Sequence, residues 1–217
     1  EIVWIANAKG ERPAYNSPKL IDVNGNQVLV TYSQGNFLGI DAKTGALLWN
    51  ESFTSKYPNH ANTVLYEDSS IFTAATIGHG LLKYKLSDDG SSITKIWHDT
   101  IIGNYFGGMI KLGDKLYTGA GGKSKYLLML DATTGSVLDS LETGNGSIIY
   151  ADQMLYTYAH KNGKVCLVDP ESFEIKVTFK VKKGTKEHFS HPVIKNGVLY
   201  IRHGNTLLAY NIKQEKP

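Results

Sequence analysis

Residues 39–49 read Gly-Ile-Asp-Ala-Lys-Thr-Gly-Ala-Leu-Leu-Trp, and the turn inside this stretch returns at residues 131–135 as Asp-Ala-Thr-Thr-Gly. Divergent copies of the turn begin at Lys85, Asp169 and Asn211, so successive copies are spaced by 44, 46, 38 and 42 residues. A motif that recurs at roughly this period indicates a repeat protein. The structural unit of the fold therefore spans about 40–45 residues.

The units contain the same segments in the same order. A small or polar residue opens a short apolar run, a hairpin-type turn follows, and two further strands are rich in β-branched, aromatic and aliphatic residues. The Asp-to-Gly turn leads to a fourth strand, which carries Trp49 in one unit and Trp97 in the next. Four short strands per unit are typical of a β-propeller blade. A β-sandwich would not repeat its turn at this period. We expect Trp49 and Trp97 to fill the gap between adjacent blades.

This pattern predicts an all-β protein, a β-propeller of four-stranded antiparallel blades with four complete blades and a partial one. Residues 1–217 are expected to form a single propeller segment. The blades are expected at residues 15–53, 60–99, 105–142, 145–181 and 189–213, with residues 1–6 as an outer strand. No window has apolar residues at helical spacing with caps, so no long helix is predicted.

The two ends of the chain leave the number of blades open. Residues 1–5, Glu-Ile-Val-Trp-Ile, match the outer strands that carry Trp49 and Trp97, whereas the fifth unit stops near Lys213, before any fourth strand. In one interpretation residues 1–5 are the fourth strand of the last unit and close a five-bladed ring. In the other they are the remnant of a preceding blade, and the chain is a fragment of a larger propeller.

Composition excludes several classes of protein. With 41% hydrophobic and 11% aromatic residues, the chain can bury a core and is not disordered. A net charge of +3, spread along the chain, is too mild for a dedicated nucleic-acid binder. No apolar stretch approaches the ~20 residues of a membrane helix, so no membrane span is expected. Cys166 is the single cysteine, which excludes an intrachain disulfide and a cysteine-rich metal site.

The pattern of residues 39–49 resembles the repeat of propellers of the pyrroloquinoline quinone (PQQ)-like type. That superfamily includes quinoprotein alcohol dehydrogenases and the propeller lipoprotein of the outer-membrane β-barrel assembly machinery. Four segments, residues 60–63, 107–108, 190–194 and 202–205, also resemble the C-terminal half of bacterial PQQ-like or polyvinyl-alcohol-dehydrogenase-like propellers. Those relatives are longer and exported. The resemblance therefore implies a periplasmic or otherwise exported protein and favours a fragment of a propeller of about eight blades.

The resemblance also implies two alternative functions. A non-catalytic propeller would act as a binding or assembly scaffold and would need no cofactor. A quinoprotein alcohol dehydrogenase, or an enzyme acting on a polymer, would place its site at the central opening, with PQQ, Ca²⁺ and an Asp general base. The vicinal disulfide of many quinoproteins is impossible with Cys166 alone, and no Cys-x-x-Cys-His haem motif occurs. We therefore favour the scaffold, with no catalytic residue, no cofactor-binding residue and no metal site.

Polar and aromatic side chains are expected at one mouth of the central opening, where the first strands begin. Imidazoles, amides and a phenol there could contact a small polar or carbohydrate ligand, or a protein partner, and converging histidines could hold a metal. The candidate ligand surface consists of Asn16, His60, Asn62, Tyr105, Asn145, His188 and His191. The identity of the ligand and the oligomeric state stay open.

Two further motifs are interpreted as structural. Residues 119–124, Gly-Ala-Gly-Gly-Lys-Ser, imitate a phosphate loop, but Tyr117 stands where its first Gly should be and a strand, not a helix, follows. We expect an ordinary loop there. The densest charge run has five lysines on and after a fourth strand, where lysines protect a sheet edge against aggregation. These are Lys176, Lys180, Lys182, Lys183 and Lys186.

Overall fold

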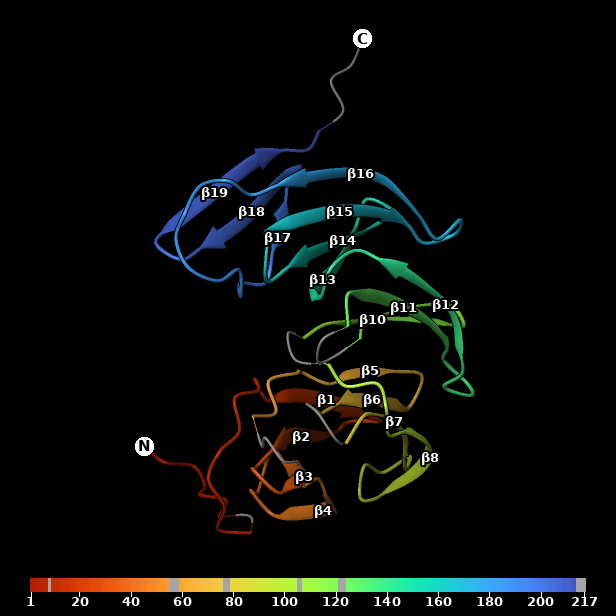
Figure 1. Ribbon diagram of the computed structural model, residues 1–217. Helices are drawn as coiled ribbons and strands as arrows, with labels where there is room; N and C mark the ends of the chain where they lie inside the picture. The colour runs from red at the N-terminus through yellow and green to blue at the C-terminus, as the bar shows by residue number, and fades with distance from the viewer. Residues whose placement is uncertain (8, 55–58, 76–78, 105–106, 121–123, 214–217) are drawn as a thin grey trace. The chain divides into compact units, whose positions relative to one another are not determined.

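The computed structural model describes residues 1–7, 9–54, 59–75, 79–104, 107–120 and 124–213 (Figure 1). Across these ranges the chain forms 19 strands and no helix. The strands make five sheets, and in every sheet each strand pairs antiparallel with the next strand of the sequence. Four sheets have four strands and the fifth has three. The all-β propeller architecture, with four complete blades and a partial one, is thereby confirmed.

The chain divides into two compact units, and each is described by itself. The first comprises residues 1–105 and 133–135 and contains two blades. The first blade consists of β1 (Lys19–Val23), β2 (Asn26–Tyr32), β3 (Asn36–Asp41) and β4 (Leu47–Ser52). The second blade consists of β5 (Leu65–Glu67), β6 (Ser70–Ala74), β7 (Leu81–Leu86) and β8 (Ile93–Asp99). One apolar cluster, which includes Tyr32, Phe37 and Trp49 of the first blade and Tyr84 of the second, joins the two sheets.

The second unit comprises residues 106–132 and 136–217 and contains three blades. The third blade consists of β9 (Met109–Leu112), β10 (Lys115–Gly119), β11 (Tyr126–Asp131) and β12 (Val137–Glu142). The fourth consists of β13 (Gly146–Ala151), β14 (Met154–Ala159), β15 (Lys164–Asp169) and β16 (Glu174–Lys180). The fifth consists of β17 (Val193–Lys195), β18 (Val198–His203) and β19 (Thr206–Asn211). Two clusters join the third blade to the fourth and the fourth to the fifth.

The repeated Asp-to-Gly turn satisfies its own backbone, which explains why the sequence can repeat it. The Asp41 carboxylate accepts hydrogen bonds from the backbone N–H groups of Lys43 and Thr44 at 2.9 and 2.7 Å. These bonds, with that from Thr44 the stronger, lower the pKa of Asp41. Gly45 closes the turn at a φ of +76°, in the left-handed region that favours glycine. A β-bulge precedes the turn between the third and fourth strands of each complete blade.

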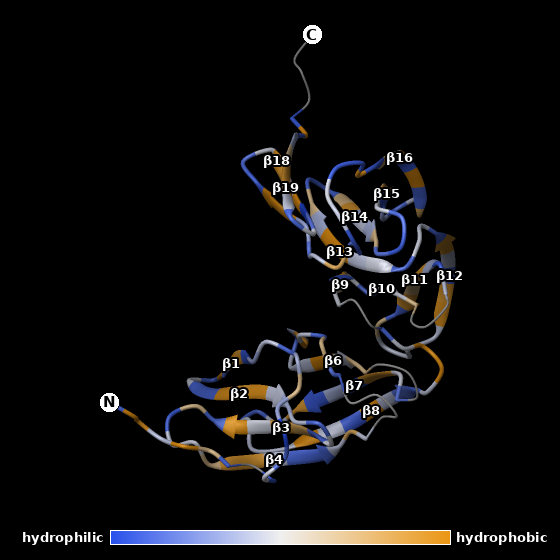
Figure 2. Ribbon diagram, turned by 60° about the vertical axis from the view of Figure 1, so that its left-hand side comes forward, coloured by the Kyte–Doolittle hydropathy of each residue, from blue (hydrophilic) through white to orange (hydrophobic). Residues whose placement is uncertain are grey.

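The tryptophans of the fourth strands pack as expected, but to different depths. Trp49 is buried, and its indole Nε1 donates a hydrogen bond to the carbonyl oxygen of Gly90 in the following blade, at 3.2 Å. Trp97 is half-buried and lies over Gly135. Figure 2 shows hydrophobic stretches along β2 and β3, the two middle strands of the first blade. The Trp49 ring covers Gly39 of β3.

Residues 1–6, expected as an outer strand, are not assigned to a strand among the described residues. A fourth strand exists only through hydrogen bonds to a third strand, and β3 and β7, the third strands of this unit, already pair with β4 and β8. Residues 1–7 accordingly have no strand structure, and Val3 is 86% exposed. Trp4 nevertheless docks on the first blade, because its Nε1 donates to the carbonyl oxygen of Ala42 at 2.9 Å, beside Gly45.

Candidate functional site

The candidate residues lie in the segments that lead into the first strands, which we call the entry segments. These are residues 13–18, 59–64, 100–104, 143–145 and 181–192, next to β1, β5, β9, β13 and β17. The turns between second and third strands lie at the same end of each blade. Six of the seven candidate residues are described, and Tyr105 lies outside the described residues.

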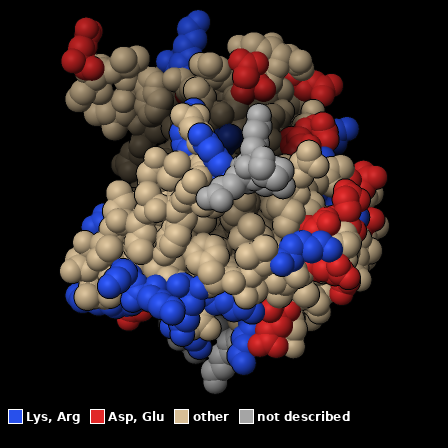
Figure 3. All heavy atoms as spheres, turned by 90° about the horizontal axis from the view of Figure 1, so that it is seen from above, with Lys and Arg blue, Asp and Glu red and all other residues tan. Residues whose placement is uncertain are grey.

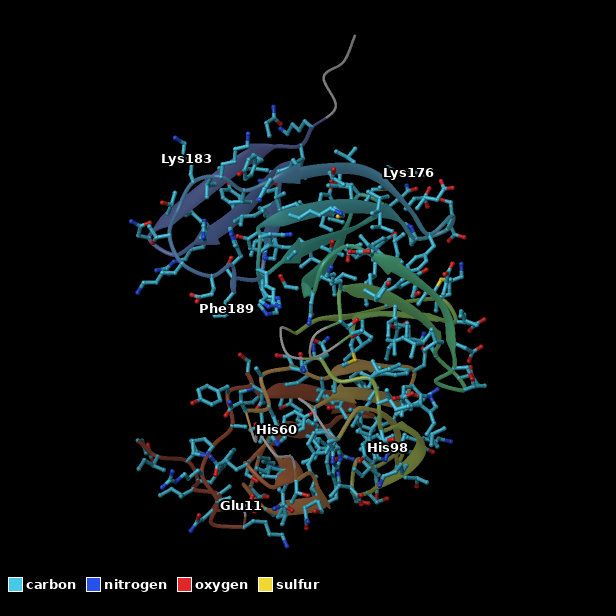
Figure 4. All side chains as sticks on the ribbon, in the orientation of Figure 1. Glu11, His60, His98, Lys176, Lys183 and Phe189 are labelled. Atoms are coloured by element: carbon cyan, nitrogen blue, oxygen red, sulfur yellow. The ribbon has the colours of Figure 1, made fainter. Side chains whose placement is uncertain are left out.

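His60 and Asn62 are buried and bonded to backbone. His60 is labelled in Figure 4. Its Nε2 lies 3.1 Å from the carbonyl oxygen of Gln34, and its ring packs against those of Tyr32 and Phe53. The Asn62 amide nitrogen donates to the carbonyl oxygens of Ala74 and Asn104 at 3.1 and 2.6 Å. Both side chains therefore tie an entry segment to neighbouring backbone.

Asn16 is the more accessible candidate of the first unit. Its amide nitrogen donates to the hydroxyl of Thr31 and to the carbonyl oxygen of Ser17, at 3.3 and 3.2 Å. The side chain is half-buried. Asn16 thus braces the start of β1 against β2 and still presents part of its amide to solvent.

Asn145 and His188 are the buried candidates of the second unit. The Asn145 backbone oxygen accepts two hydrogen bonds from His160, one from the backbone N–H at 2.9 Å and one involving the ring Nδ1 at 2.6 Å. His188 Nδ1 lies 2.5 Å from the hydroxyl of Tyr158, and the His188 ring stacks on that of His203 with centroids 3.6 Å apart. His191, in the same entry segment as His188, is exposed.

The His203 ring contacts the backbone of the entry segment formed by residues 181–192. Its Nδ1 and Nε2 each lie 2.7 Å from a backbone carbonyl oxygen, that of Lys183 and that of Lys186. Gly184, at a φ of +106°, passes so close that a Cβ there would lie 2.6 Å from His203 Nδ1. The backbone of residues 183–188 is therefore wrapped around a stacked histidine pair.

The five lysines around this segment do not form one cluster. Lys176 lies at one end of β16 and pairs with Glu174 at 2.6 Å, whereas Lys183 lies beyond the other end (Figure 4). Figure 3 shows Lys and Arg side chains gathered along one side of the viewed surface and Asp and Glu along another. The exposed members near the entry segment are Lys180, Lys182, Lys183 and Lys186.

Sequence reasoning overlooked three large apolar side chains that the entry segments expose. Tyr15 is 77% exposed, Ile101 is 89% exposed and Phe189 is 57% exposed. Each lies in a different entry segment. A large apolar residue within a polar connection was the available signal, but such residues are by default assigned to the core.

The described residues do not fit a quinoprotein metal centre. Ca²⁺ takes six to eight oxygen ligands or so, chiefly from carboxylates and carbonyls. The candidate surface contains amides and imidazoles but no carboxylate, and no group of three His, Cys, Asp or Glu in the described ranges could hold a metal. Cys166 is buried, and burial raises the pKa of its thiol. No helix in the described part of the chain is long and apolar enough to cross a membrane.

Acid is expected to destabilise the fold through its buried histidines. Burial lowers the pKa of His60, although its hydrogen bond to the Gln34 carbonyl oxygen favours the charged form. Burial also lowers the pKa of His188, and the neighbouring His203 and Lys180 lower it further. The unfolded chain, with histidine pKa values of about 6.5, then takes up these protons first as the pH falls. The stability that the neutral buried histidines provide is therefore fully present above about pH 6.5, and it is lost as the pH falls toward their lowered pKa in the folded protein.

Urea unfolding between pH 8 and pH 5 measures this effect. The free energy of unfolding should fall from pH 7 to pH 5, and His60→Gln should reduce that fall. The matched change His191→Gln, at an exposed histidine, should leave it as in the parent protein. An equal pH dependence in the His60→Gln variant would contradict the assignment.

Comparisons with known proteins agree with this architecture. The family described as outer membrane protein assembly factor BamB matches residues 1–140, more than half of the chain. BamB from Moraxella catarrhalis is 16% identical with a TM-score of 0.64, over 91% of this chain and 58% of its own. A quinohemoprotein alcohol dehydrogenase, ADHIIG from Pseudomonas putida HK5, is 15% identical with a TM-score of 0.64, over 93% of this chain and 42% of its own.

No curated protein matches the sequence. The chain spans about half the length of the two solved structures, and at these identities the likeness to each shows the fold alone. The family match adds the repeat pattern itself, which runs through both blades of the first unit and most of the third blade. The chain belongs to the outer membrane protein assembly factor BamB family of PQQ-like propellers.

Proposed function

We propose that this chain is part of an exported, non-catalytic scaffold that binds protein partners during the assembly of outer membrane proteins. The name of the matched family supports the process, and the periplasm is the compartment in which it would take place. The observation that carries the proposal is the exposure of Tyr15, Ile101 and Phe189 in three entry segments. Exposed aromatic and large aliphatic side chains are typical anchors of protein interfaces.

Each of the three side chains projects from a backbone that is already fixed. The Tyr15 N–H donates to the carbonyl oxygen of His60 at 3.1 Å. The Ile101 N–H donates to the Asp99 carboxylate at 2.7 Å, while the adjacent Ile102 is buried and anchors the segment. A preorganised contact residue loses little conformational entropy on binding, so its apolar area contributes more fully to affinity.

Phe189 is held in the same manner. Its ring lies parallel to that of His160, with centroids 6.2 Å apart and 21° between the planes. The residue before it, His188, donates its backbone N–H to the carbonyl oxygen of His160 at 3.1 Å. The buried polar candidates therefore position the entry segments, and the exposed apolar residues remain for a partner.

Site-specific photo-crosslinking in cells tests whether each of these three side chains contacts a partner. Benzoylphenylalanine placed at Tyr15, Ile101 or Phe189 should form adducts with proteins of the outer membrane assembly machinery. The same probe at Leu138 or Val177 should not, because these residues lie on the outer strands β12 and β16. They too are exposed, at 52% and 50%, so the comparison separates position from exposure. Equal adducts at all five positions, or none at the first three, would refute the proposed role of these residues.

The enzymatic alternative has its own test. The purified protein is incubated with PQQ and Ca²⁺ and assayed for dye-linked oxidation of primary alcohols. We expect no turnover above the cofactor alone. Turnover that disappears when candidate residues such as His60 or His191 are replaced would sink the scaffold proposal.

A further inference from the structure

A pocket of about 270 Å³ lies within the second unit, between the third and fourth blades. Three stretches form its walls. The third blade contributes the two residues just before β11 and the end of β12, and the fourth contributes the segment that leads into β13 and the turn between β14 and β15. The lining residues are Ser124, Lys125, residues 142–145, residues 159–162 and Lys164. Neither the candidate ligand surface, apart from Asn145, nor the proposed protein interface uses this pocket.

Positive charge predominates in the lining. Its described residues include three lysines, at positions 125, 161 and 164, against one acidic residue, Glu142. Lys125 is offset, because its Nζ lies 3.7 Å from the Glu142 carboxylate. Among the described residues, neither Lys161 nor Lys164 forms an ion pair. Two ammonium groups at one pocket without a carboxylate partner favour an anion in the space between the blades.

Hydrogen bonds and close packing hold the turn that carries these two lysines. The Asn162 side-chain oxygen accepts the backbone N–H of Lys164 at 3.0 Å, and the N–H of Gly163 donates to the carbonyl oxygen of Ala159 at 3.0 Å. Gly163 has a φ of +66°, and a Cβ there would lie 2.5 Å from the His188 ring. Because these contacts hold the backbone of the turn, only the side chains of Lys161 and Lys164 have to become ordered when a ligand binds.

Further polar side chains complete the lining. His160 is held by Asn145, and the hydroxyl oxygen of Ser124 accepts the backbone N–H of Tyr126 at 3.3 Å. Ser124 is the described end of the glycine-rich segment that imitates a phosphate loop in sequence. Hydroxyl and amide donors beside ammonium groups are suited to the oxygens of a carboxylate or phosphate.

We propose that this pocket binds the anionic group, a carboxylate or a phosphate, of a small ligand. A volume of about 270 Å³ admits a small acid or a phosphate-bearing group but not a folded partner. The aliphatic stems of the lysines provide apolar walls around their charged ends. The site is independent of the protein interface proposed above, so either can fail without the other.

Calorimetric titration of the purified chain at low salt tests the site. The probes are inorganic phosphate, succinate and, as an uncharged control, glucose. We expect phosphate or succinate to bind and to weaken as sodium chloride is added, and the stronger of the two identifies the source of the anion. Lys161→Gln combined with Lys164→Gln should weaken that binding by about tenfold or more.

The matched control is Lys182→Gln with Lys183→Gln, which removes the same charge from exposed positions outside the pocket. Its affinity should equal that of the parent protein, and circular dichroism should show all variants folded. Lys161→Gln alone, in an exposed turn, should give part of the loss. Absence of binding by both anions, equal weakening in both double variants, or stronger binding of glucose would overturn the proposal.

Discussion

Replacing Trp49 by alanine is expected to lower the free energy of unfolding by about 3–5 kcal/mol. The side chain is only 8% exposed, and its ring packs against Phe37 with centroids 5.3 Å apart. It also covers Gly39 so closely that a Cβ there would lie 2.0 Å from the ring. The variant would lose this packing and leave the Gly90 carbonyl oxygen without its indole donor. Urea unfolding followed by circular dichroism measures the change.

Trp97→Ala is the matched control for this prediction. Trp97 occupies the same place on the fourth strand of the next blade, but it is half-buried. Its ring centroid lies 6.2 Å from that of Phe72. Its replacement should cost about 1–2 kcal/mol, because less apolar area leaves water on folding. The sequence alone gave no reason to separate the two tryptophans. A loss below about 1 kcal/mol for Trp49→Ala would show that its side chain is not buried in solution.

The repeat made the blades predictable because each blade is built from local interactions. Within each sheet, consecutive strands of the chain pair with one another, and the Asp41 turn is closed by hydrogen bonds within five residues. Period, turn chemistry and apolar runs therefore contain nearly all the information that a sheet needs. The outer strand expected at residues 1–6 had the right residues, but pairing depends on a partner strand that its sequence does not specify.

The candidate site was less predictable because burial depends on contacts far apart in the sequence. His60 and Asn62 stand in a polar connection, as ligand-binding residues would, but the acceptor of His60 is 26 residues away and one acceptor of Asn62 is 42 residues away. Such bonds turn candidate ligand contacts into braces. Conversely, Tyr15, Ile101 and Phe189 would be assigned to the core from composition, and only the fold shows that they are exposed.

Gly146→Ala is expected to destabilise the protein by about 3 kcal/mol or more, although it adds a single methyl group. Gly146 begins β13, beside the buried Asn145, and pairs with Ala159 of β14. A Cβ at this position would lie 1.7 Å from the backbone oxygen of Tyr158 and 2.6 Å from its carbonyl carbon. Because the obstacle is backbone, no side-chain rotation can make room, and the β13–β14 ladder has to shift.

Gly119→Ala separates this clash from a general effect of substituting a buried glycine. Gly119 ends β10 in the neighbouring blade, and a Cβ there would meet the Gly146 carbonyl oxygen at 3.4 Å and the Asn145 side-chain oxygen at 3.6 Å, which is ordinary contact. Its φ is not in the left-handed region, so alanine is accommodated, and the free energy of unfolding should change by less than about 1 kcal/mol. Urea unfolding measures both variants. Equal losses in the free energy of unfolding would mean that a Cβ at Gly146 fits beside Tyr158, and that a small residue is not required there for steric reasons.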